Sequence, residues 1–189
     1  MRTEHAPATD LLEIENELRP AKVRRRAIER LDGIFVAGRT PDPQPDGFLE
    51  GRLVTMAVHP ILDNFVRRVA DLWMPWLGKS FDPNTGTGVN ILVPAAKLPM
   101  KALWPSYQPE RVFVDRIEVF PFRTRIAPGE VDPAVDVLKI DYDSDANPSF
   151  IIRRILDELV QIGDREYLGK ILFRTRSGFR NIGFFSLHS

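Results

Sequence analysis

The chain has 189 residues, and its 26 Lys and Arg side chains balance 26 Asp and Glu side chains, so its formal charge is zero. This length suits one domain with a helical appendage, and the charge balance excludes a strongly basic nucleic-acid-binding module. Because the sequence has no cysteine and three histidines, it excludes disulfides, thiolate metal sites and a cysteine nucleophile, and it disfavours a histidine metal cage. We therefore expect no nucleic-acid partner, no metal and no cofactor.

Residues 1–20 are polar and acidic and lack the apolar core of a secretory signal. No stretch of the sequence approaches the roughly 18 consecutive apolar residues that cross a membrane. We therefore expect a cytoplasmic protein without a membrane span, and a homodimer stays open.

Helical periodicity is found in the N-terminal part of the chain. Apolar residues recur every three or four positions over residues 10–19 and again over 21–36, with Pro20 between them at a position that suits the first turn of a helix. The three arginines at positions 24–26 lie opposite the apolar side of the second helix. They indicate a solvated helix face, with an anion-binding patch as the alternative.

The rest of the chain reads mainly as short strands. A polar loop over 40–47 leads into a strand over 48–58, and an amphipathic helix follows over 61–73. Glycines at 169 and 183 inside the last two strands indicate the bends or close approaches that a closed barrel needs. About eight sequential strands with short turns are typical of an up-and-down barrel. The further strands are expected over 89–93, 116–126, 135–142, 159–162, 167–175 and 179–187, with helical turns over 95–103 and either a helix or a strand over 150–156.

Three segments carry a resemblance to a known family. GFLEG at 47–51 opens the first strand, WLGKSF at 76–81 follows the predicted helix, and glycine-rich and aromatic residues at 167–170 and 183–187 form the last hairpin. Together they resemble the lipocalin-like, uncharacterised bacterial GXWXG family, although Leu49 stands where that family has its tryptophan. The resemblance implies a calycin-type barrel that binds a small apolar ligand inside, in a wider group that also includes enzymes and haem-binding proteins.

We therefore predict an α+β fold in which N-terminal helices pack on a mostly antiparallel, lipocalin-like β-barrel. The helical segment is expected to cover residues 1–39. The barrel domain is expected to cover residues 40–189, with an inserted helix near residues 60–74.

Two groups of side chains are candidates for ligand binding. Around Lys79, the aromatic residues Trp73, Trp76 and Phe81 either line the mouth of a pocket, with Lys79 reaching a carboxylate or phosphate, or fill the core while Lys79 extends to water. On two predicted strands, alternation gives shared faces whose charged residues either point into the barrel as clamps for an anion or form solvated pairs outside. These are Arg123 with Arg125, and Lys139 with Asp141.

Acid–base chemistry in a dry barrel would need an Asp–Tyr or Asp–Arg pair with a shifted pKa. The catalytic candidates are Asp141 and Tyr142, and Tyr167 is a further phenol and ligand-binding candidate. Asp157 and Glu158 are further carboxylates. They fall beside Arg153 and Arg154 in a charged cluster that we expect on the surface.

The function we expect is the binding of a small hydrophobic or amphipathic ligand, such as a fatty acid, an isoprenoid or a polyketide-like molecule, in the barrel interior. One alternative is a small-molecule isomerase or cyclase that uses a buried carboxylate. The other is a protein-interaction or structural module that docks a partner through its first two helices. A buried carboxylate with a raised pKa would favour the enzyme, and a wholly apolar interior would count against it.

Overall fold

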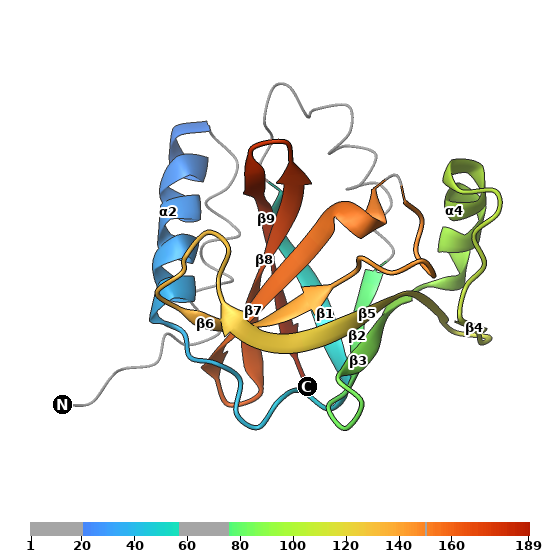
Figure 1. Ribbon diagram of the computed structural model, residues 1–189, viewed down its shortest axis with the longest axis horizontal. Helices are drawn as coiled ribbons and strands as arrows, with labels where there is room; N and C mark the ends of the chain where they lie inside the picture. Colours follow the sequence, from blue (N-terminus) through green and yellow to red (C-terminus); the bar gives the residue numbers. More distant parts are fainter. Residues whose placement is uncertain (1–20, 57–75, 150) are drawn as a thin grey trace.

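The computed structural model describes residues 21–56, 76–149 and 151–189. In this part of the chain, nine antiparallel strands follow the order β3-β2-β1-β9-β8-β7-β6-β5-β4, and a further pairing of β3 with β5 closes eight of them into a barrel (Figure 1). The strands are β1 (Gly47–Met56), β2 (Trp76–Asp82), β3 (Thr87–Leu92), β4 (Arg111–Val112), β5 (Ile117–Pro128), β6 (Asp136–Asp141), β7 (Ile155–Gly163), β8 (Glu166–Thr175) and β9 (Gly178–His188). The described helices are α2 (Ala21–Ala37), α4 (Lys97–Leu103) and the 3-10 turns η1 (Pro94–Ala96) and η2 (Ile152–Arg154).

The antiparallel barrel predicted from the sequence is confirmed. Six expected strands appear within a few residues of their predicted bounds, as β1, β3, β5, β6, β8 and β9. Three segments differ. WLGKSF lies in β2 and the pair Arg111–Val112 forms β4, and the sequence predicts a strand at neither place. β7 begins at Ile155 rather than at Leu159, directly after the turn η2. The helices expected over 10–19 and 61–73 lie outside the described residues.

Cross-strand register assigns each side chain to the inside or the outside of the barrel. Directly opposite residues of an antiparallel pair share one face, so a row of partners can be followed from strand to strand. The row Arg125, Lys139, Glu158, Lys170 and Phe184 points outward. The next row, Ile140, Asp157 and Ile171, points inward. A shift of one residue along β7 therefore separates an interior acid from an exterior one.

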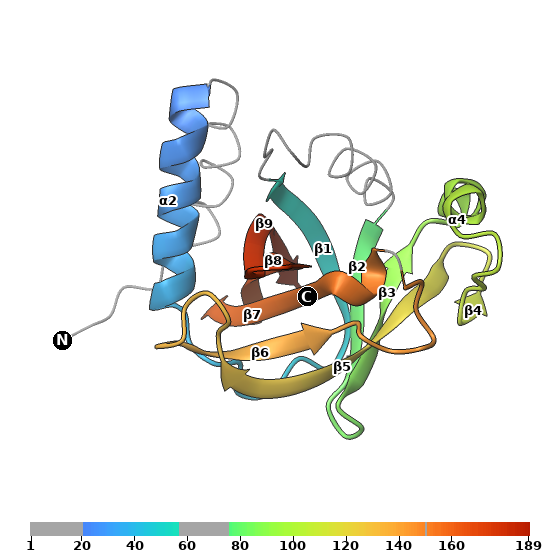
Figure 2. The same ribbon diagram turned by 45° about the horizontal axis from the view of Figure 1, so that its top comes forward.

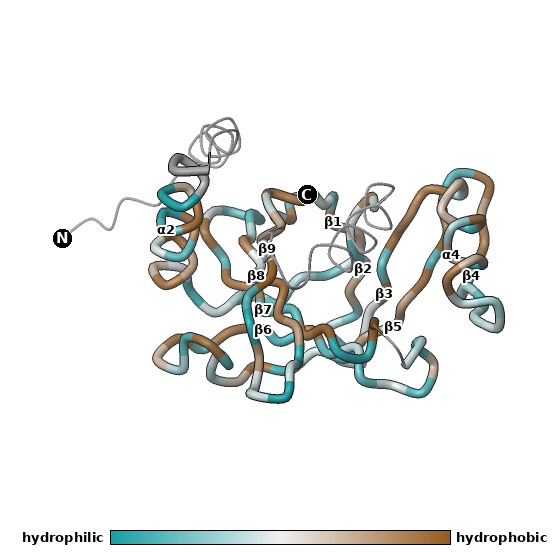
Figure 3. The backbone as a smooth tube through the Cα atoms, turned by 90° about the horizontal axis from the view of Figure 1, so that it is seen from above, coloured by the Kyte–Doolittle hydropathy of each residue, from teal (hydrophilic) through white to brown (hydrophobic). Residues whose placement is uncertain are grey.

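Helix α2 contributes to a cluster on the outer side of the barrel. Its residues Ala27, Leu31 and Phe35 are fully buried and belong to one apolar cluster with residues of β6 to β9. Figure 2 shows α2 standing beside the strands, and Figure 3 shows it on the side of the barrel opposite to α4 and β4. Arg25 is solvent-exposed and lies 3.4 Å from Glu29, which fits the solvated helix face expected there.

Glycines let aromatic rings lie against the inner wall of the barrel. Gly169 is the direct partner of Phe185, and a Cβ atom on Gly169 would overlap the Phe185 ring. The same relation joins Gly88 to the ring of Phe122 and Gly51 to the ring of Trp76. The sequence-based expectation of a close approach at Gly169 is thereby confirmed. The ring positions matter because Trp76, Phe122 and Phe185 all surround one buried amine, described below.

An arm made of α4 and β4 projects from the barrel between β3 and β5 (Figure 2). The rings of Trp104 and Tyr107 in this arm lie 5.6 Å and 5.2 Å from the ring of Phe120 on β5. Among the described helices, none combines the length and the apolar character that crossing a bilayer requires.

The Gly169–Phe185 contact predicts a large effect of a single methyl group. We expect Gly169→Ala to lower the free energy of unfolding by about 1–3 kcal/mol, because the new Cβ must displace the buried Phe185 ring from its contacts. The control is Gly33→Ala in α2, where a Cβ meets open space and alanine favours the helix by about 0.5–1 kcal/mol. Urea unfolding measures both variants, and equal stability of the two would contradict this description of the barrel wall.

Candidate functional site

Four polar side chains from four strands or strand ends meet in the barrel interior. Lys79 Nζ on β2 lies 3.0 Å from Asp157 Oδ2 on β7 and donates a hydrogen bond to Asn90 Oδ1 on β3 at 2.9 Å. It also donates to the hydroxyl of Tyr142, which follows β6, and that hydroxyl donates to Asp157 Oδ2 at 3.0 Å. Asn90 Nδ2 donates to the same hydroxyl at 3.2 Å. We call these four residues the interior polar cluster.

Aromatic rings enclose the amine of this cluster. Lys79 Nζ lies 5.1 Å to 5.6 Å from the ring centroids of four residues, within the range at which a ring quadrupole attracts a cation. Lys79 and Asp157 are both 0% exposed. The four rings are those of Trp76, Phe122, Tyr142 and Phe185.

Unusual backbone geometry supports Asn90. At the bulge where β5 pairs with β3, Phe120 has a φ of 51°, a left-handed conformation that is strained for a bulky residue. Both peptide groups of Phe120 are held by side chains, because its carbonyl accepts from Asn90 Nδ2 at 3.2 Å and its N–H donates to the Tyr107 hydroxyl at 2.7 Å. The strained residue therefore provides the carbonyl that orients the Asn90 amide.

A second asparagine positions Tyr142. Asn147 Nδ2 donates to the carbonyl of Tyr142 at 2.9 Å and to the carbonyl of Pro121 at 2.7 Å. These bonds tie the turn after β6 to β5. Tyr142 therefore keeps its ring inside the barrel although it lies one residue beyond the end of the strand.

Burial shifts the protonation of every titratable member of the cluster toward its neutral form. Loss of solvation lowers the pKa of Lys79, against the opposing effect of the nearby Asp157 carboxylate. Loss of solvation also raises the pKa of Asp157 and the pKa of Tyr142. An amine of lowered pKa next to a carboxyl of raised pKa can exchange a proton over 3.0 Å at small energetic cost.

One oxygen of the cluster lacks a hydrogen bond. Asp157 Oδ1 is buried and has no hydrogen-bond partner within the described part of the protein. Leaving a buried charged acceptor without a partner costs about 1–3 kcal/mol or more. This oxygen accepts a hydrogen bond from a hydroxyl when Asp157 is ionised and donates one to a carbonyl when Asp157 is protonated. It is therefore the position in the cluster whose hydrogen-bonding capacity is unused.

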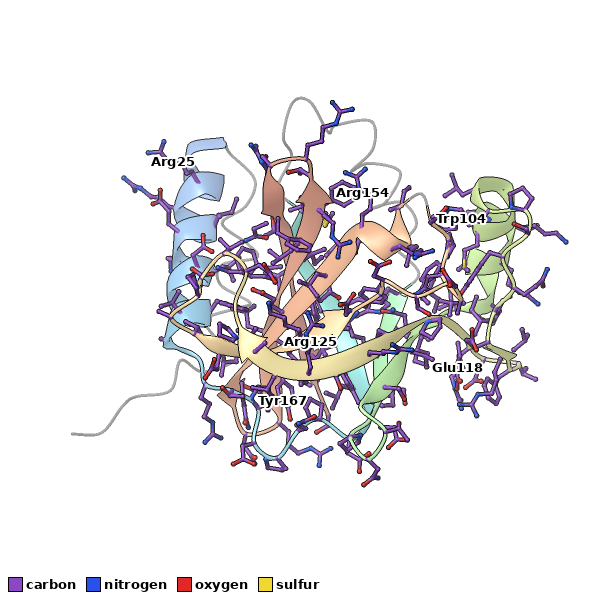
Figure 4. All side chains as sticks on the ribbon, in the orientation of Figure 1. Arg25, Trp104, Glu118, Arg125, Arg154 and Tyr167 are labelled. Carbon is purple, nitrogen blue, oxygen red and sulfur yellow. The ribbon has the colours of Figure 1, made fainter. Side chains whose placement is uncertain are left out.

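The structure gathers five of the sequence-predicted residues at the interior. Lys79 and Tyr142 belong to the interior polar cluster, and Trp76 and Phe81 belong to the apolar cluster inside the barrel. The alternative in which Lys79 extends to water is wrong, because its amine reaches the carboxylate of Asp157 instead. Tyr167 also joins this apolar cluster, near the lower end of the barrel in Figure 4, and loss of solvation raises its pKa. Trp73 lies outside the described residues.

Four other predicted residues lie on the outer face, so the inward orientation that the sequence left open does not occur. Arg125, labelled in Figure 4, and Asp141 form a partly exposed ion pair at 3.0 Å. Arg123 is exposed and lines a groove of about 440 Å³ together with Ser80 and Thr87. Lys139 does not pair with Asp141; instead it is buried against Glu130, at 2.6 Å.

Lys139 belongs to a second buried charged group, which we call the outer charge ladder. Lys139, Glu158 and Lys170 are direct partners on β6, β7 and β8. The two lysines also form ion pairs with acids outside these strands, namely Glu130 and Asp132 in the β5–β6 loop and Asp32 in α2. The distances are 2.6 Å for Lys139–Glu130, 3.8 Å for Lys139–Glu158, 2.6 Å for Lys170–Asp132 and 2.7 Å for Lys170–Asp32.

The expected surface position of Asp157 and Glu158 is wrong. Both are 0% exposed, whereas Arg153 and Arg154 in η2 are only partly covered and bind Asp143 and the carbonyl of Arg174. The physical reason is that β7 is covered on both faces, by the barrel interior and by the outer cluster with α2. The sequence does contain a signal for this burial, because apolar residues flank the two acids on both sides in the segment ILDELVQI. Asn90 carried no such signal, because a single asparagine in a short strand is unremarkable.

In the part of the chain that the structure describes, no three His, Asp or Glu side chains form a group suited to a metal ion. Comparisons with protein-family models, with curated proteins and with solved structures find no match to this chain. The likeness to the GXWXG family thus rests on the sequence segments given above, and the barrel itself rests on the strand pairing.

A double-mutant cycle tests the Lys79–Asp157 pair. We expect Lys79→Met or Asp157→Leu alone to lower the free energy of unfolding by about 3–5 kcal/mol, because each leaves one buried charge without its partner. The double variant should be more stable than either single variant, since it removes both charges from the interior. The matched control is Arg125→Met with Asp141→Leu, whose coupling should stay below about 1 kcal/mol because that pair is partly exposed. Additive losses at Lys79 and Asp157 would contradict the pairing.

The outer charge ladder predicts a pH dependence. Loss of solvation raises the pKa of Glu158 above its ordinary value of 4.5, so the stability this group contributes is present below that pH and is lost as the pH rises through its folded-state pKa. We therefore expect Glu158→Gln to gain stability relative to the wild type between about pH 4 and pH 7. Urea unfolding at both pH values measures this difference. A difference that is independent of pH would show that Glu158 is not destabilised by burial.

Proposed function

We propose that the barrel binds a small, largely apolar molecule whose single polar group, a hydroxyl or a carbonyl, contacts Asp157. The observation that carries this proposal is the buried Asp157 Oδ1 atom without a hydrogen-bond partner, within an interior lined by aromatic rings. A protein rarely keeps a costly unpaired acceptor at the centre of its core without a use for it.

The other polar atoms of the cluster support Asp157 as the contact. Lys79 Nζ already contacts three acceptors, namely Asn90 Oδ1, the Tyr142 hydroxyl and Asp157 Oδ2. The Tyr142 hydroxyl accepts from Lys79 and Asn90 while donating to Asp157. A ligand that leaves these bonds intact therefore meets the cluster at Asp157 Oδ1.

The charge of the cluster favours a neutral ligand. An ionised fatty acid would place its carboxylate beside that of Asp157, and like charges in a poorly solvated interior repel strongly. A hydroxyl or carbonyl group on an isoprenoid-like or polyketide-like skeleton avoids this repulsion. The apolar skeleton would contact rings such as Trp76, Phe122 and Phe185, which supply much of the interior surface.

A second candidate function is acid–base catalysis on such a molecule, as in an isomerase or a cyclase. The observation that favours it is the raised pKa of Asp157 together with the Tyr142 hydroxyl, which donates to Asp157 Oδ2 at 3.0 Å. In this case Asp157 would remove a proton from carbon next to the polar group, and Tyr142 would stabilise the resulting oxyanion. Incubation of a bound ketone in D2O separates the two functions, because catalysis would introduce deuterium at carbon and binding alone would not.

Organic extraction of the purified protein tests the proposed binding. Wild-type protein prepared without detergent should release a neutral, mostly apolar compound that mass spectrometry detects in an amount comparable to that of the protein. Asp157→Leu should release little of it, because the polar contact is lost, whereas Asp141→Asn on the outer face should release as much as the wild type. Circular dichroism checks the folding of both variants. Wild-type extracts that match those of the buffer, together with no binding of added cinnamyl alcohol or cinnamaldehyde, would contradict the proposal.

A further inference from the structure

Three lysines with described side chains are buried, and their surroundings differ. They are Lys79, Lys139 and Lys170. Lys139 and Lys170 lie on the outer face, and each contacts two carboxylates. Lys79 lies inside the barrel and contacts the carboxylate of Asp157, whose Oδ1 atom has no hydrogen-bond partner in the described part of the protein.

The surroundings of Lys79 raise the share of its neutral amine, which is the nucleophilic form of lysine, relative to that of an exposed lysine. Its burial among four rings removes water from the ammonium ion and lowers the pKa of Lys79. Asp157 Oδ2, 3.0 Å away, is the acceptor for the proton that the ammonium ion gives up. The same proton transfer leaves the proton on Asp157 Oδ2, so the Asp157 carboxyl becomes an acid beside the amine and can donate that proton to a carbonyl oxygen.

From this arrangement we infer that Lys79 forms an imine with an aldehyde or ketone ligand held in the barrel. The inference rests on the proposed function, because the carbonyl compound must first occupy the interior beside Asp157. It narrows the class of ligand from neutral molecules in general to carbonyl compounds.

The chemical step balances without any further reactant. The lone pair of Lys79 Nζ attacks the carbonyl carbon, and the carbonyl oxygen takes the Asp157 proton to give a carbinolamine. A second proton, lost from the nitrogen and carried through the Asp157 carboxyl, lets the hydroxyl leave as water. The net change is R–CHO plus Lys79–NH2 to R–CH=N–Lys79 plus H2O, with no oxidation or reduction.

The interior polar cluster would also stabilise the imine once it has formed. A protonated imine is a cation at the position of the ammonium ion, so the Asp157 carboxylate serves as its counter-ion and the four rings attract its charge. The Tyr142 hydroxyl contacts both Lys79 and Asp157 and can pass a proton between them. Asn90 fixes the amine through its Oδ1 atom, 2.9 Å away.

Reductive trapping on the folded wild-type protein tests this inference. The protein is incubated with trans-cinnamaldehyde and sodium cyanoborohydride, and the site of modification is found by peptide mapping. We expect one adduct per chain at Lys79, with a mass equal to that of the aldehyde less one oxygen atom, formed at least tenfold faster than at Lys139 and Lys170. The exposed Lys97 and Lys101 report the background reaction of surface amines.

Two variants and one analogue complete the test. Lys79→Met combined with Asp157→Leu removes the amine without leaving a buried charge, and it should lose the Lys79 adduct while the surface adducts persist. Asp157→Asn keeps the amine and should slow trapping at least tenfold. Cinnamyl alcohol, which has the same skeleton without a carbonyl, should bind, as followed by tryptophan fluorescence, and should leave no adduct.

The outcomes separate this inference from the proposed function. Binding of the alcohol with no preferred adduct at Lys79 would overturn the imine and leave the binding proposal intact. A failure of both the alcohol and the aldehyde to bind would overturn both. Equal labelling of Lys79 and the outer lysines would also overturn the imine, because the interior surroundings would then confer no reactivity.

Discussion

The ion pair between Lys79 and Asp157 joins β2 to β7 across the interior of the barrel, between strands that do not pair with each other. Taking two charges out of water costs several kcal/mol for each ion, and the pair alone rarely recovers that cost. Here Tyr142, Asn90 and four rings add hydrogen bonds and cation–π contacts around it. These contacts offset part of the desolvation cost of the pair.

Two features of the barrel wall allow side chains to surround this ion pair. Rings can reach the centre because glycines on neighbouring strands leave room for them, as Gly169 does for Phe185. The strained backbone of Phe120 provides the carbonyl that holds Asn90. A structural role alone would be met more simply by apolar side chains of similar volume, which often stabilise a core better than a buried ion pair does. The buried Lys79–Asp157 pair and the unpaired Asp157 Oδ1 atom are therefore the observations on which the proposed binding and the proposed imine rest.

β7 carries a buried acid on each of its two faces. In a sheet with one solvent-facing side, one of two neighbouring residues would be exposed, whereas here an outer layer covers the second face. Asp157 points inward to Lys79, and Glu158 points outward to Lys139 and to the backbone N–H of Glu130. Both acids are buried, because α2 and the β5–β6 loop cover the outer side of this part of the barrel. The two charged groups are thus separated by one strand and serve different purposes, one inside the barrel and one holding the loop and helix against it.

The sequence predicted the local features well and the site only in part. Alternation and turn residues located β8, β9 and most other strands, and Gly169 indicated a close approach, because these signals depend on neighbouring residues alone. The sequence also singled out Lys79 and Tyr142. It could not show that Lys79 meets Asp157, since the two meet only when the barrel closes, nor that β7 is covered on both faces, since that depends on α2 and the β5–β6 loop.

An NMR titration of the lysine Cε carbons and the aspartate carboxyl carbons tests whether burial shifts the protonation of the Lys79–Asp157 pair, with the exposed Lys97 and Lys101 as internal references. We expect Lys79 to titrate at a lower pH than these two lysines, and the Asp157 carboxyl carbon to titrate above the range of an exposed aspartate. A Lys79 signal that titrates together with those of Lys97 and Lys101 would contradict the account, because the amine would then lie in surroundings no different from water.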